Sequence, residues 1–373
     1  MRPVWAEVNL KAIAENVKTL KALTKPEVLF MAVVKADGYG HGAVPVARAA
    51  LESGADRLGV ALAEEGTQLR HEKIEVPIQI LSEISPDDHS LEQVVENDLI
   101  ATLCQKEVAR ALSKAAQDKG KTLKVHIKVD TGMNRLGLPA DPTAVYEFAK
   151  FVEDLPNLEI EGVFTHFALA DRPENNFTTE QFRRFKAVLD RLEQEGVKIP
   201  LKHAANSAAI IAFPQTHLDM VRAGISLYGL PPSAELAGRI ELSPALGLKT
   251  RISYLKEVPP GQGISYGHTY VAQETRQVAT LPLGYADGYS RLLSNKSEVL
   301  VKGKRVKEIG TICMDQFMVD VTGVPEVSVG EEVVLIGKQG SEEVTADELA
   351  NLLGTINYEV VCMISKRVPR IYV

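Results

Sequence analysis

A single lysine stands where a predicted strand ends, and it is the residue with the clearest chemical potential. Residues 28–34 form an unbroken run of seven apolar residues, which is typical of a strand buried on both faces. Lys35 follows this run directly, and residues 37–42 contain three glycines that permit sharp turns. Burying a charged amine costs free energy unless the amine is paired, solvated or chemically used. These residues leave two interpretations open: a lysine that reaches solvent at a strand end, or an amine that forms an imine with a carbonyl cofactor.

The element that ends at Lys35 belongs to a longer alternation of strand-like and helical segments. Eight apolar, strand-like segments are separated by helical patterns, at residues 28–34, 58–61, 77–81, 99–104, 123–129, 160–164, 201–203 and 220–223. This number and order predict an N-terminal (β/α)8 TIM-like barrel of the α/β class. An open doubly wound sheet is the alternative. It normally has a glycine-rich phosphate turn after its first strand and an acidic ribose partner, which are not evident here.

The alternation stops near residues 231–244, and the rest of the chain is rich in short β-like runs. These runs cover residues 250–258, 277–281, 298–301, 317–321 and 332–336, and one helix is expected at residues 346–353. We therefore predict a barrel domain over residues 1–240 and a mainly-β domain over residues 241–373. The first strand, within residues 1–8, is compatible with either domain.

Composition restricts the class of protein. A chain of 373 residues with 45% hydrophobic and 24% charged residues is expected to form two globular domains. The formal charge of −7 argues against a nucleic-acid partner. No apolar run has the length of a membrane span, and charges near the N-terminus argue against a signal peptide. Three widely spaced cysteines fit a reducing cytoplasm and give no support to a metal site.

Polar residues follow the ends of several predicted strands. In a barrel of this kind, reactive groups belong at the C-terminal ends of the strands. The residues at or just after these ends are Lys35, Lys128, Arg135, His166, Ser207, Arg222 and Gly224. A single strand-end arginine or histidine is more often structural. Their joint placement favours a functional site.

Nine segments of the chain resemble bacterial alanine racemases in order and spacing. They are AVVKADGYGHG, HIKVDTGMNRLG, THF, NS, VRAGISLYG, SYG, GYADGY, CMDQ and INYE. The resemblance covers nearly the whole chain. It implies a pyridoxal 5′-phosphate enzyme that interconverts L-alanine and D-alanine and supplies D-alanine for peptidoglycan.

The resemblance also implies which residues hold the cofactor. Lys35 would carry it, and residues matching its phosphate ligands are Tyr39, Ser207, Gly224, Ile225 and Tyr358. Independently, Ser207 begins a predicted helix over residues 207–213 whose unpaired N–H groups favour an anion. Arg222 matches the arginine that faces the pyridine nitrogen, with His166 supporting it. Because an arginine stays protonated, it gives that nitrogen no proton, which disfavours decarboxylation and transamination.

Racemisation needs proton removal on one face of the α-carbon and proton delivery on the other, for which two bases are the simpler solution. The resemblance implies Lys35 and Tyr266, and phenols ionise near pH 10 unless a cation helps. Arg135 is the candidate cation and would orient the substrate carboxylate together with the Met314 backbone N–H. Supporting positions are Lys128, Tyr285, Cys313 and Asp315.

By the same resemblance, Tyr266, Tyr285, Met314 and Asp315 enter from a partner subunit, so a head-to-tail homodimer is expected. Lys128 matches a lysine that is carbamylated in some family members, and the unmodified lysine stays open. Three other functions stay open as well. They are a broader racemase that accepts serine, a pyridoxal-phosphate decarboxylase, against which Arg222 argues, and a non-catalytic cofactor-binding protein, which is typically shorter.

Overall fold

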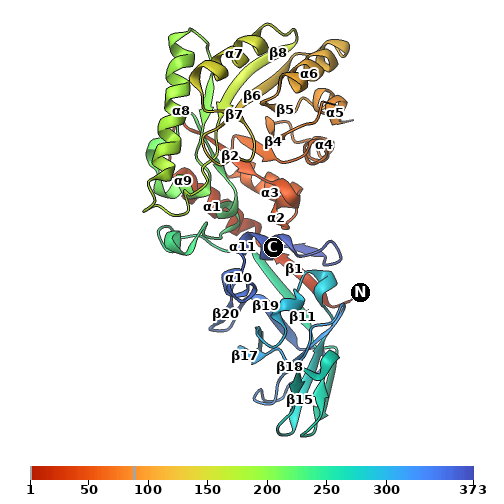
Figure 1. Ribbon diagram of the computed structural model, residues 1–373. Helices are drawn as coiled ribbons and strands as arrows, with labels where there is room; N and C mark the ends of the chain where they lie inside the picture. The colour runs from red at the N-terminus through yellow and green to blue at the C-terminus, as the bar shows by residue number, and fades with distance from the viewer. Residues whose placement is uncertain (1, 87–89) are drawn as a thin grey trace. The chain divides into compact units, whose positions relative to one another are not determined.

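The computed structural model describes residues 2–86 and 90–373 (Figure 1). Residue 1, the start of the predicted first domain, lies outside the described residues. The chain forms two compact units: a β-rich unit of Met1–Leu10, Tyr39–Gly42 and Ala245–Val373, and a barrel unit of Lys11–Gly38 and Ala43–Pro244.

The barrel unit contains eight parallel strands in the order β10-β2-β3-β4-β5-β6-β8-β9. Their bounds are β2 Leu29–Val33, β3 Arg57–Val60, β4 Ile78–Glu83, β5 Ile100–Leu103, β6 Leu123–Asp130, β8 Leu158–Phe164, β9 Leu201–His203 and β10 Met220–Ala223, with β7 Leu138–Pro139 beside β6. Backbone hydrogen bonds join the two end strands, from Asp219 N to Lys202 O and from Arg222 N to Ala205 O, both 3.0 Å. The predicted (β/α)8 barrel is confirmed.

Helices form an outer layer around these strands in Figure 1. They are α1 Leu10–Lys21, α3 Ala43–Glu52, α4 Ala63–His71, α5 Ser90–Glu96, α6 Lys106–Asp118, α7 Pro142–Glu153, α8 Phe177–Gln194 and α9 Ser207–Ala212, with the 3-10 helices η1 Pro214–Thr216, η2 Ile225–Tyr228 and η3 Ala234–Leu236. Local sequence determines where these helices begin and which face of each is buried. For example, the Asp141 carboxylate accepts hydrogen bonds from the first N–H groups of α7, and Pro142 occupies its first turn. Helix α6 buries Val108, Leu112 and Ala116, which share one face.

The β-rich unit contains a seven-stranded sheet in the order β17-β16-β19-β11-β1-β21, with β20 paired to β19. The bounds are β1 Val4–Val8, β11 Leu246–Arg251, β16 Glu298–Val301, β17 Lys304–Lys307, β19 Glu332–Gln339, β20 Glu342–Val344 and β21 Arg370–Tyr372. A second sheet contains β12 Tyr254–Val258, β15 Arg276–Leu281 and β18 Phe317–Asp320, and β13 Gly263–Ile264 pairs with β14 Tyr270–Val271. Short helices are η4 Tyr266–His268, η5 Tyr285–Asp287, η6 Arg291–Leu293, α10 Ala346–Leu353 and α11 Asn357–Cys362. The predicted mainly-β domain is confirmed.

The prediction of one continuous run over residues 250–258 is wrong, because the backbone changes sheets between β11 and β12. Ile252 N donates to Glu331 O, next to β19, whereas Ser253 N donates to Thr280 O on β15. Two successive residues therefore bond to different sheets. Across residues 2–86 and 90–373, no helix combines the length and apolar character needed to cross a bilayer.

Candidate active site

The predicted site residues fall into three groups, and each group lies within one unit. The barrel unit holds Lys35, Lys128, Arg135, His166, Ser207, Arg222, Gly224 and Ile225. The β-rich unit holds a tyrosine pair, Tyr39 and Tyr358. Its loops hold Tyr266, Tyr285, Cys313, Met314 and Asp315.

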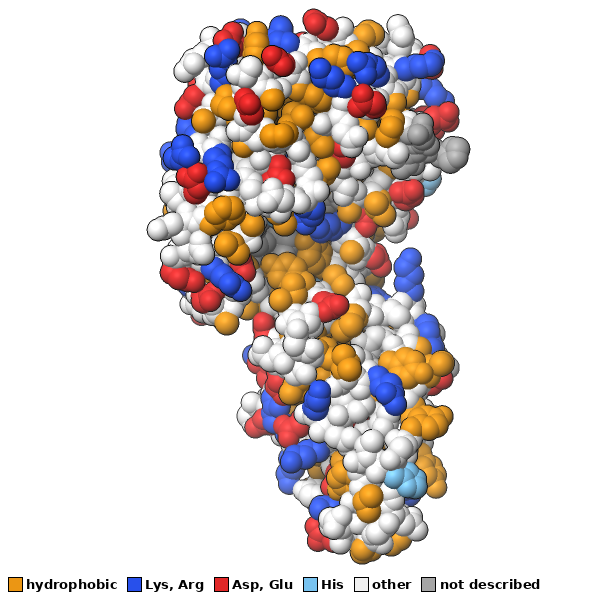
Figure 2. Space-filling view, viewed as in Figure 1, with side chains coloured by type: hydrophobic (Ala, Val, Ile, Leu, Met, Phe, Trp, Pro, Cys, Tyr) orange, Lys and Arg blue, Asp and Glu red, His pale blue; other side chains and the backbone are white. Residues whose placement is uncertain are grey.

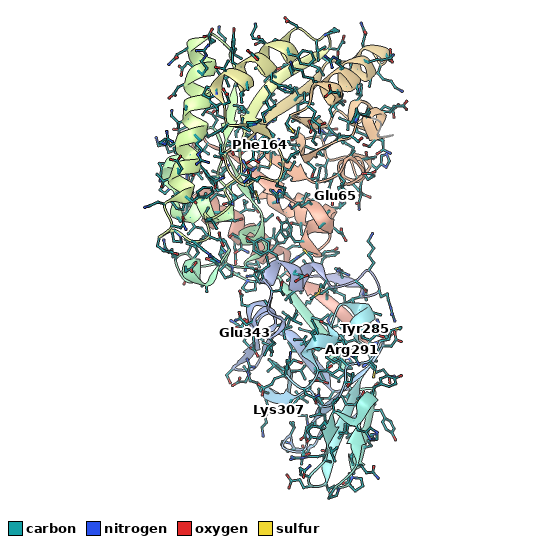
Figure 3. All side chains as sticks on the ribbon, in the orientation of Figure 1. Glu65, Phe164, Tyr285, Arg291, Lys307 and Glu343 are labelled. Atoms are coloured by element: carbon teal, nitrogen blue, oxygen red, sulfur yellow. The ribbon has the colours of Figure 1, made fainter. Side chains whose placement is uncertain are left out.

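Lys35 lies at the start of a left-handed turn, α2 Lys35–Tyr39. Five successive residues have positive φ, at 52°, 53°, 61°, 51° and 80° for Ala36, Asp37, Gly38, Tyr39 and Gly40. Each non-glycine residue in this region costs about 1 kcal/mol, so the turn needs outside support. Two carboxylates support the turn by accepting backbone hydrogen bonds. Glu65 Oε1 accepts from Ala36 N at 2.6 Å, and Asp37 Oδ1 accepts from Ala43 N at 2.9 Å. Figure 3 shows Glu65 on α4.

Arg222 on β10 is buried, and acceptors at the ends of β8 and β9 fix its guanidinium. It donates to His203 Nδ1 at 2.8 Å, to Thr165 O at 2.8 Å, to Ala204 O at 2.9 Å and to His166 Nδ1 at 3.1 Å. Burial lowers the pKa of Arg222 to about 9, so it still carries its charge at neutral pH. The structure brings the predicted Arg222–His166 pair together. It adds His203, which the strand-end pattern of the sequence did not indicate.

Ser207 begins α9 and joins it to the segment after β10. Its Oγ accepts hydrogen bonds from Gly224 N at 2.8 Å and from Ser226 N at 3.4 Å. Asn206 caps the same helix by accepting from Ala209 N at 3.0 Å. The Ser226 hydroxyl is buried and has no hydrogen-bond partner within the described part of the chain. A buried polar atom of this kind indicates a missing partner.

This donor set fits pyridoxal phosphate, the cofactor that the resemblance implies. An anionic phosphate suits the unpaired Ser226 hydroxyl and the backbone beside Gly224. The same unit supplies an amine at Lys35 and a fixed cation at Arg222. The residues are therefore of the types that the phosphate, aldehyde and pyridine ring of this cofactor require.

Four basic side chains act electrostatically on the half-buried His166. Burial, and then Arg222, Lys128, Arg135 and Lys35, all lower the pKa of His166 well below its ordinary value. This imidazole is neutral at neutral pH, which agrees with its role as an acceptor for Arg222.

Lys128 lies within β6, with its Nζ 4.4 Å from the centre of the Phe164 ring. Burial, and then Arg222 and Arg135, lower the pKa of Lys128 well below its ordinary value, which favours the neutral amine. Arg135 is exposed in the loop after β6. Asp130 shapes that loop by accepting from Gly132 N at 2.8 Å and from Asn134 N at 3.1 Å.

The two tyrosines of the second group lie together. The ring centres of Tyr39 and Tyr358 are 6.3 Å apart, with the rings tilted by 48°. Tyr39 is buried, and burial, together with nearby Cys362, raises the pKa of its phenol. Tyr358 lies on α11.

Tyr266 has an exposed side chain on a loop whose backbone is hydrogen-bonded to Thr311. Its phenol side chain is 70% exposed, while its carbonyl accepts from Thr311 Oγ1 at 2.8 Å. The preceding Ser265 has a φ of 64° and donates to Thr311 O at 2.5 Å. The backbone of this loop is thus fixed, although the phenol faces solvent within this unit.

Tyr285 and the segment 313–315 form one connected structure. Tyr285 N donates to Cys313 O and Ala286 N donates to Met314 O, both at 3.1 Å. Arg367 holds Asp315 through a 2.6 Å ion pair. The side chains of Tyr285 and Met314 stay 42% and 52% exposed. Figure 3 shows Tyr285 on η5, and Figure 2 shows further apolar side chains (orange) on the surface of this unit.

The chain matches two family models along almost its full length. They are the alanine racemase N-terminal domain over residues 8–232 and the alanine racemase C-terminal domain over residues 245–372. It is 51% identical over 371 residues to an alanine racemase of Halothermothrix orenii, covering 100% of this chain and 97% of that protein.

Solved structures of racemases are also similar to this chain over its full length. The alanine racemase of Bacillus anthracis with bound L-Ala-P superimposes with a TM-score of 0.94 at 43% identity, covering 100% of this chain and 95% of that chain. A histidine racemase of Leuconostoc mesenteroides has a TM-score of 0.91 at 30% identity, with 100% and 98% covered. Since both domain models match in order and the identity extends over the whole chain, this chain belongs to the alanine racemase family.

Proposed function

We propose that the chain interconverts L-alanine and D-alanine, with its pyridoxal phosphate held on Lys35 and with two bases, Lys35 and Tyr266 of the partner subunit. Family membership makes it a pyridoxal-phosphate-dependent racemase. The observation that best supports the mechanism is the buried Arg222, whose donors are fixed by acceptors on or directly after two strands, β8 and β9. Pyridoxal phosphate, when bound, stabilises negative charge at the α-carbon of the amino acid.

The protein's own residues then bind, orient and exchange protons. As the family resemblance implies, the residues that would hold the phosphate are Ser207, Gly224, Ile225, Tyr39 and Tyr358. Arg222, supported by His166, would contact the pyridine nitrogen and would give it no proton. The cofactor would then delocalise less negative charge, which would favour return of a proton over bond cleavage at the carboxylate.

The substrate carboxylate is oriented by Arg135 and by the Met314 backbone N–H. Lys35 moves a proton on one face of the α-carbon, and the phenol of Tyr266 moves a proton on the other. Asp315, fixed by Arg367, and Cys313 support the loop that carries Met314, while Tyr285 narrows the entrance. Lys128, a buried amine, positions Arg135 if carbamylated, and an intact-mass measurement under native conditions distinguishes the two forms.

The exposure of Tyr266 supports a homodimer in which each site takes residues from both copies. We place the enzyme in the cytoplasm, supplying D-alanine for peptidoglycan. Because a histidine racemase has the same fold, the assay must compare alanine with serine and histidine.

The test uses purified holoenzyme and chiral detection of D-alanine formed from L-alanine. Tyr266→Phe is expected to reduce turnover by about 100- to 10,000-fold, as for loss of a general base. Tyr254→Phe is the matched control, because Tyr254 is also an exposed tyrosine of the β-rich unit, at 58%. If wild-type holoenzyme forms no D-alanine, the proposed activity is wrong.

Two further measurements separate the mechanism from the activity. With one base removed, Tyr266→Phe should still exchange the α-proton of one enantiomer with deuterated water, but not that of the other. Mixing inactive Lys35→Ala and Tyr266→Phe subunits should restore activity, because each mixed dimer has one intact shared site. No restoration after verified subunit exchange would contradict a shared site.

A further inference from the structure

A row of buried ionisable side chains extends from Arg222 into the barrel unit, and the proposed reaction uses only its first member. The row continues through His203 on β9 and His126 on β6 to Glu161 on β8. Both histidines are 0% exposed and Glu161 is 4% exposed. Consecutive members are 2.8, 2.8 and 3.0 Å apart. Every junction has hydrogen-bond length, so the row is one continuous chain.

The chemistry of the two ends fixes where each proton lies. Arg222 can only donate, so Nδ1 of His203 must accept and its proton lies on Nε2. That Nε2–H donates to Nδ1 of His126, whose own proton therefore also lies on Nε2. His126 Nε2–H then donates to Glu161 Oε2. All three hydrogen bonds point from Arg222 towards Glu161.

Glu161 terminates the row as an ion. Arg57 donates to its two oxygens at 2.6 and 3.1 Å, and Lys124 donates to Oε1 at 2.9 Å. Although burial alone would raise the pKa of Glu161, hydrogen bonds from His126, Arg57 and Lys124 lower it overall. Burial lowers the pKa of His126 and that of His203, so each ring carries one proton. A carboxylate that only accepts keeps the direction of the row fixed.

The backbone and side chains around this row leave space for the two histidine rings and hold them in place. A Cβ at Gly162 would lie 2.5 Å from the His126 ring, so only glycine leaves space for it. The pairing of β6 with β8 shifts register between Val125 and His126, which places His126 opposite Gly162. Phe164, labelled on β8 in Figure 3, stacks on His203 with ring centres 4.7 Å apart and planes within 1°. Both rings are therefore held in place.

We propose that Glu161 is a positioning residue for Arg222: through His126 and His203 it keeps the hydrogen bonds pointing one way, so that His203 always accepts from the guanidinium. The direction of the hydrogen bonds, from Arg222 towards Glu161, does not depend on the proposed function. Its effect on turnover rests on that function, since Arg222 is there assigned to the cofactor's pyridine nitrogen.

Glu161→Gln reverses the row for a geometric reason. Oε1 faces two obligatory donors, Arg57 and Lys124, whereas Oε2 faces Arg57 and the adaptable His126. The amide NH2 of glutamine therefore takes the Oε2 position and donates to His126. His126 must then donate from Nδ1, and His203 presents an N–H to the N–H of Arg222. That contact has no acceptor.

The first measurement reads the ring tautomers by ¹⁵N NMR of histidine-labelled holoenzyme, a simple spectrum because the chain has eight histidines. In the wild type, His126 and His203 are expected as neutral Nε2–H tautomers. In Glu161→Gln both are expected to shift to Nδ1–H. Lys124→Gln is the control, since it removes a half-exposed partner of Glu161 but keeps the carboxylate. Its tautomers should match the wild type.

The second measurement compares kinetics and cofactor absorption across the same proteins, after circular dichroism confirms that each is folded. Glu161→Gln should lower kcat about 10- to 100-fold, as for residues that orient a metal ligand, with little change in KM. It should also alter the absorption spectrum, while Lys124→Gln behaves as the wild type.

Three results would overturn the inference. The first is an Nδ1–H or doubly protonated His126 or His203 in the wild type, a measurement that needs no variant to fold. The second is unchanged tautomers in Glu161→Gln. The third is reversed tautomers with wild-type kcat and absorption, which would show that the row does not act on Arg222. A wild type without racemase activity but with the expected tautomers would refute the proposed function alone.

Discussion

Glu308, which follows β17, is a buried carboxyl group with no ion-pair partner among the described residues, and replacing it should stabilise the protein in alkaline solution. Its side chain accepts a hydrogen bond from Asn295 N, but its Oε1 has no partner among the described residues. The residue is 2% exposed, and burial raises the pKa of Glu308 to about 8. The folded protein therefore holds a proton there that the unfolded chain releases.

The sign and size of the effect follow from the two pKa values. The unfolded group ionises near 4.5 and the folded group near 8, so the unfolded state binds fewer protons between these pH values. Unfolding thus becomes easier as pH rises through this window. The gap of roughly 3.5 pKa units corresponds to about 5 kcal/mol of lost stability above pH 8, an upper bound for a group that can relax.

The assay is urea unfolding of wild type and Glu308→Gln at pH 5 and at pH 8.5. The neutral amide mimics the protonated acid, so the two proteins should differ by less than about 1 kcal/mol at pH 5. At pH 8.5 the variant should be more stable by about 2–5 kcal/mol. Glu274→Gln is the control, because Glu274 is an exposed carboxylate at 70% that pairs with Arg276. An equal difference at both pH values would refute the reasoning.

Three further substitutions test single contacts. Asn16→Ala removes a buried amide that makes three hydrogen bonds of 2.8–3.2 Å to backbone groups, and should cost about 2–3 kcal/mol in urea unfolding. Ser207→Ala removes the acceptor of Gly224 N and should weaken cofactor binding about tenfold or more in a fluorescence titration, with thermal stability changed far less. Gly40→Ala would place a Cβ 2.4 Å from the Val361 carbonyl at a φ of +80°, and should lower the unfolding free energy by about 2 kcal/mol or more.

The barrel was the easier part to predict, because strands buried on both faces appear as continuous apolar runs. The helix at 346–353 was predicted with its correct bounds, since Thr345 caps its start and Gly354 ends it. The sheet change at 252–253 was missed, because it depends on partners far away in the sequence. Helix α11, Asn357–Cys362, is too short for its periodicity to be read.

In the candidate site, too, features set by local sequence were predicted, and features set by distant contacts were not. The rule that reactive groups follow barrel strands pointed to His166 and Arg222, and the structure brings these two side chains together. The row from His203 to Glu161 was not identified, because strand register sets its contacts across 35 and 77 residues of sequence. One local signal existed: His126 and Lys128 are two residues apart on β6, so they share a face. Which ring nitrogen carries a proton depends on the final partners and cannot be read from sequence.

The left-handed turn after Lys35 has a consequence for the order of assembly. An unfolded chain of L-residues avoids this conformation at Ala36 and Asp37, and its supporting carboxylate at Glu65 arrives from a separate helix. The Lys35 amine thus reaches its native position only after the surrounding strands and α4 have packed together. With Lys35 as the attachment point proposed above, the absorbance of covalently bound cofactor during refolding should lag behind the recovery of helical circular dichroism. Covalent binding of the cofactor would then indicate that folding is complete. Newly synthesised chains would remain without cofactor until the barrel unit has folded.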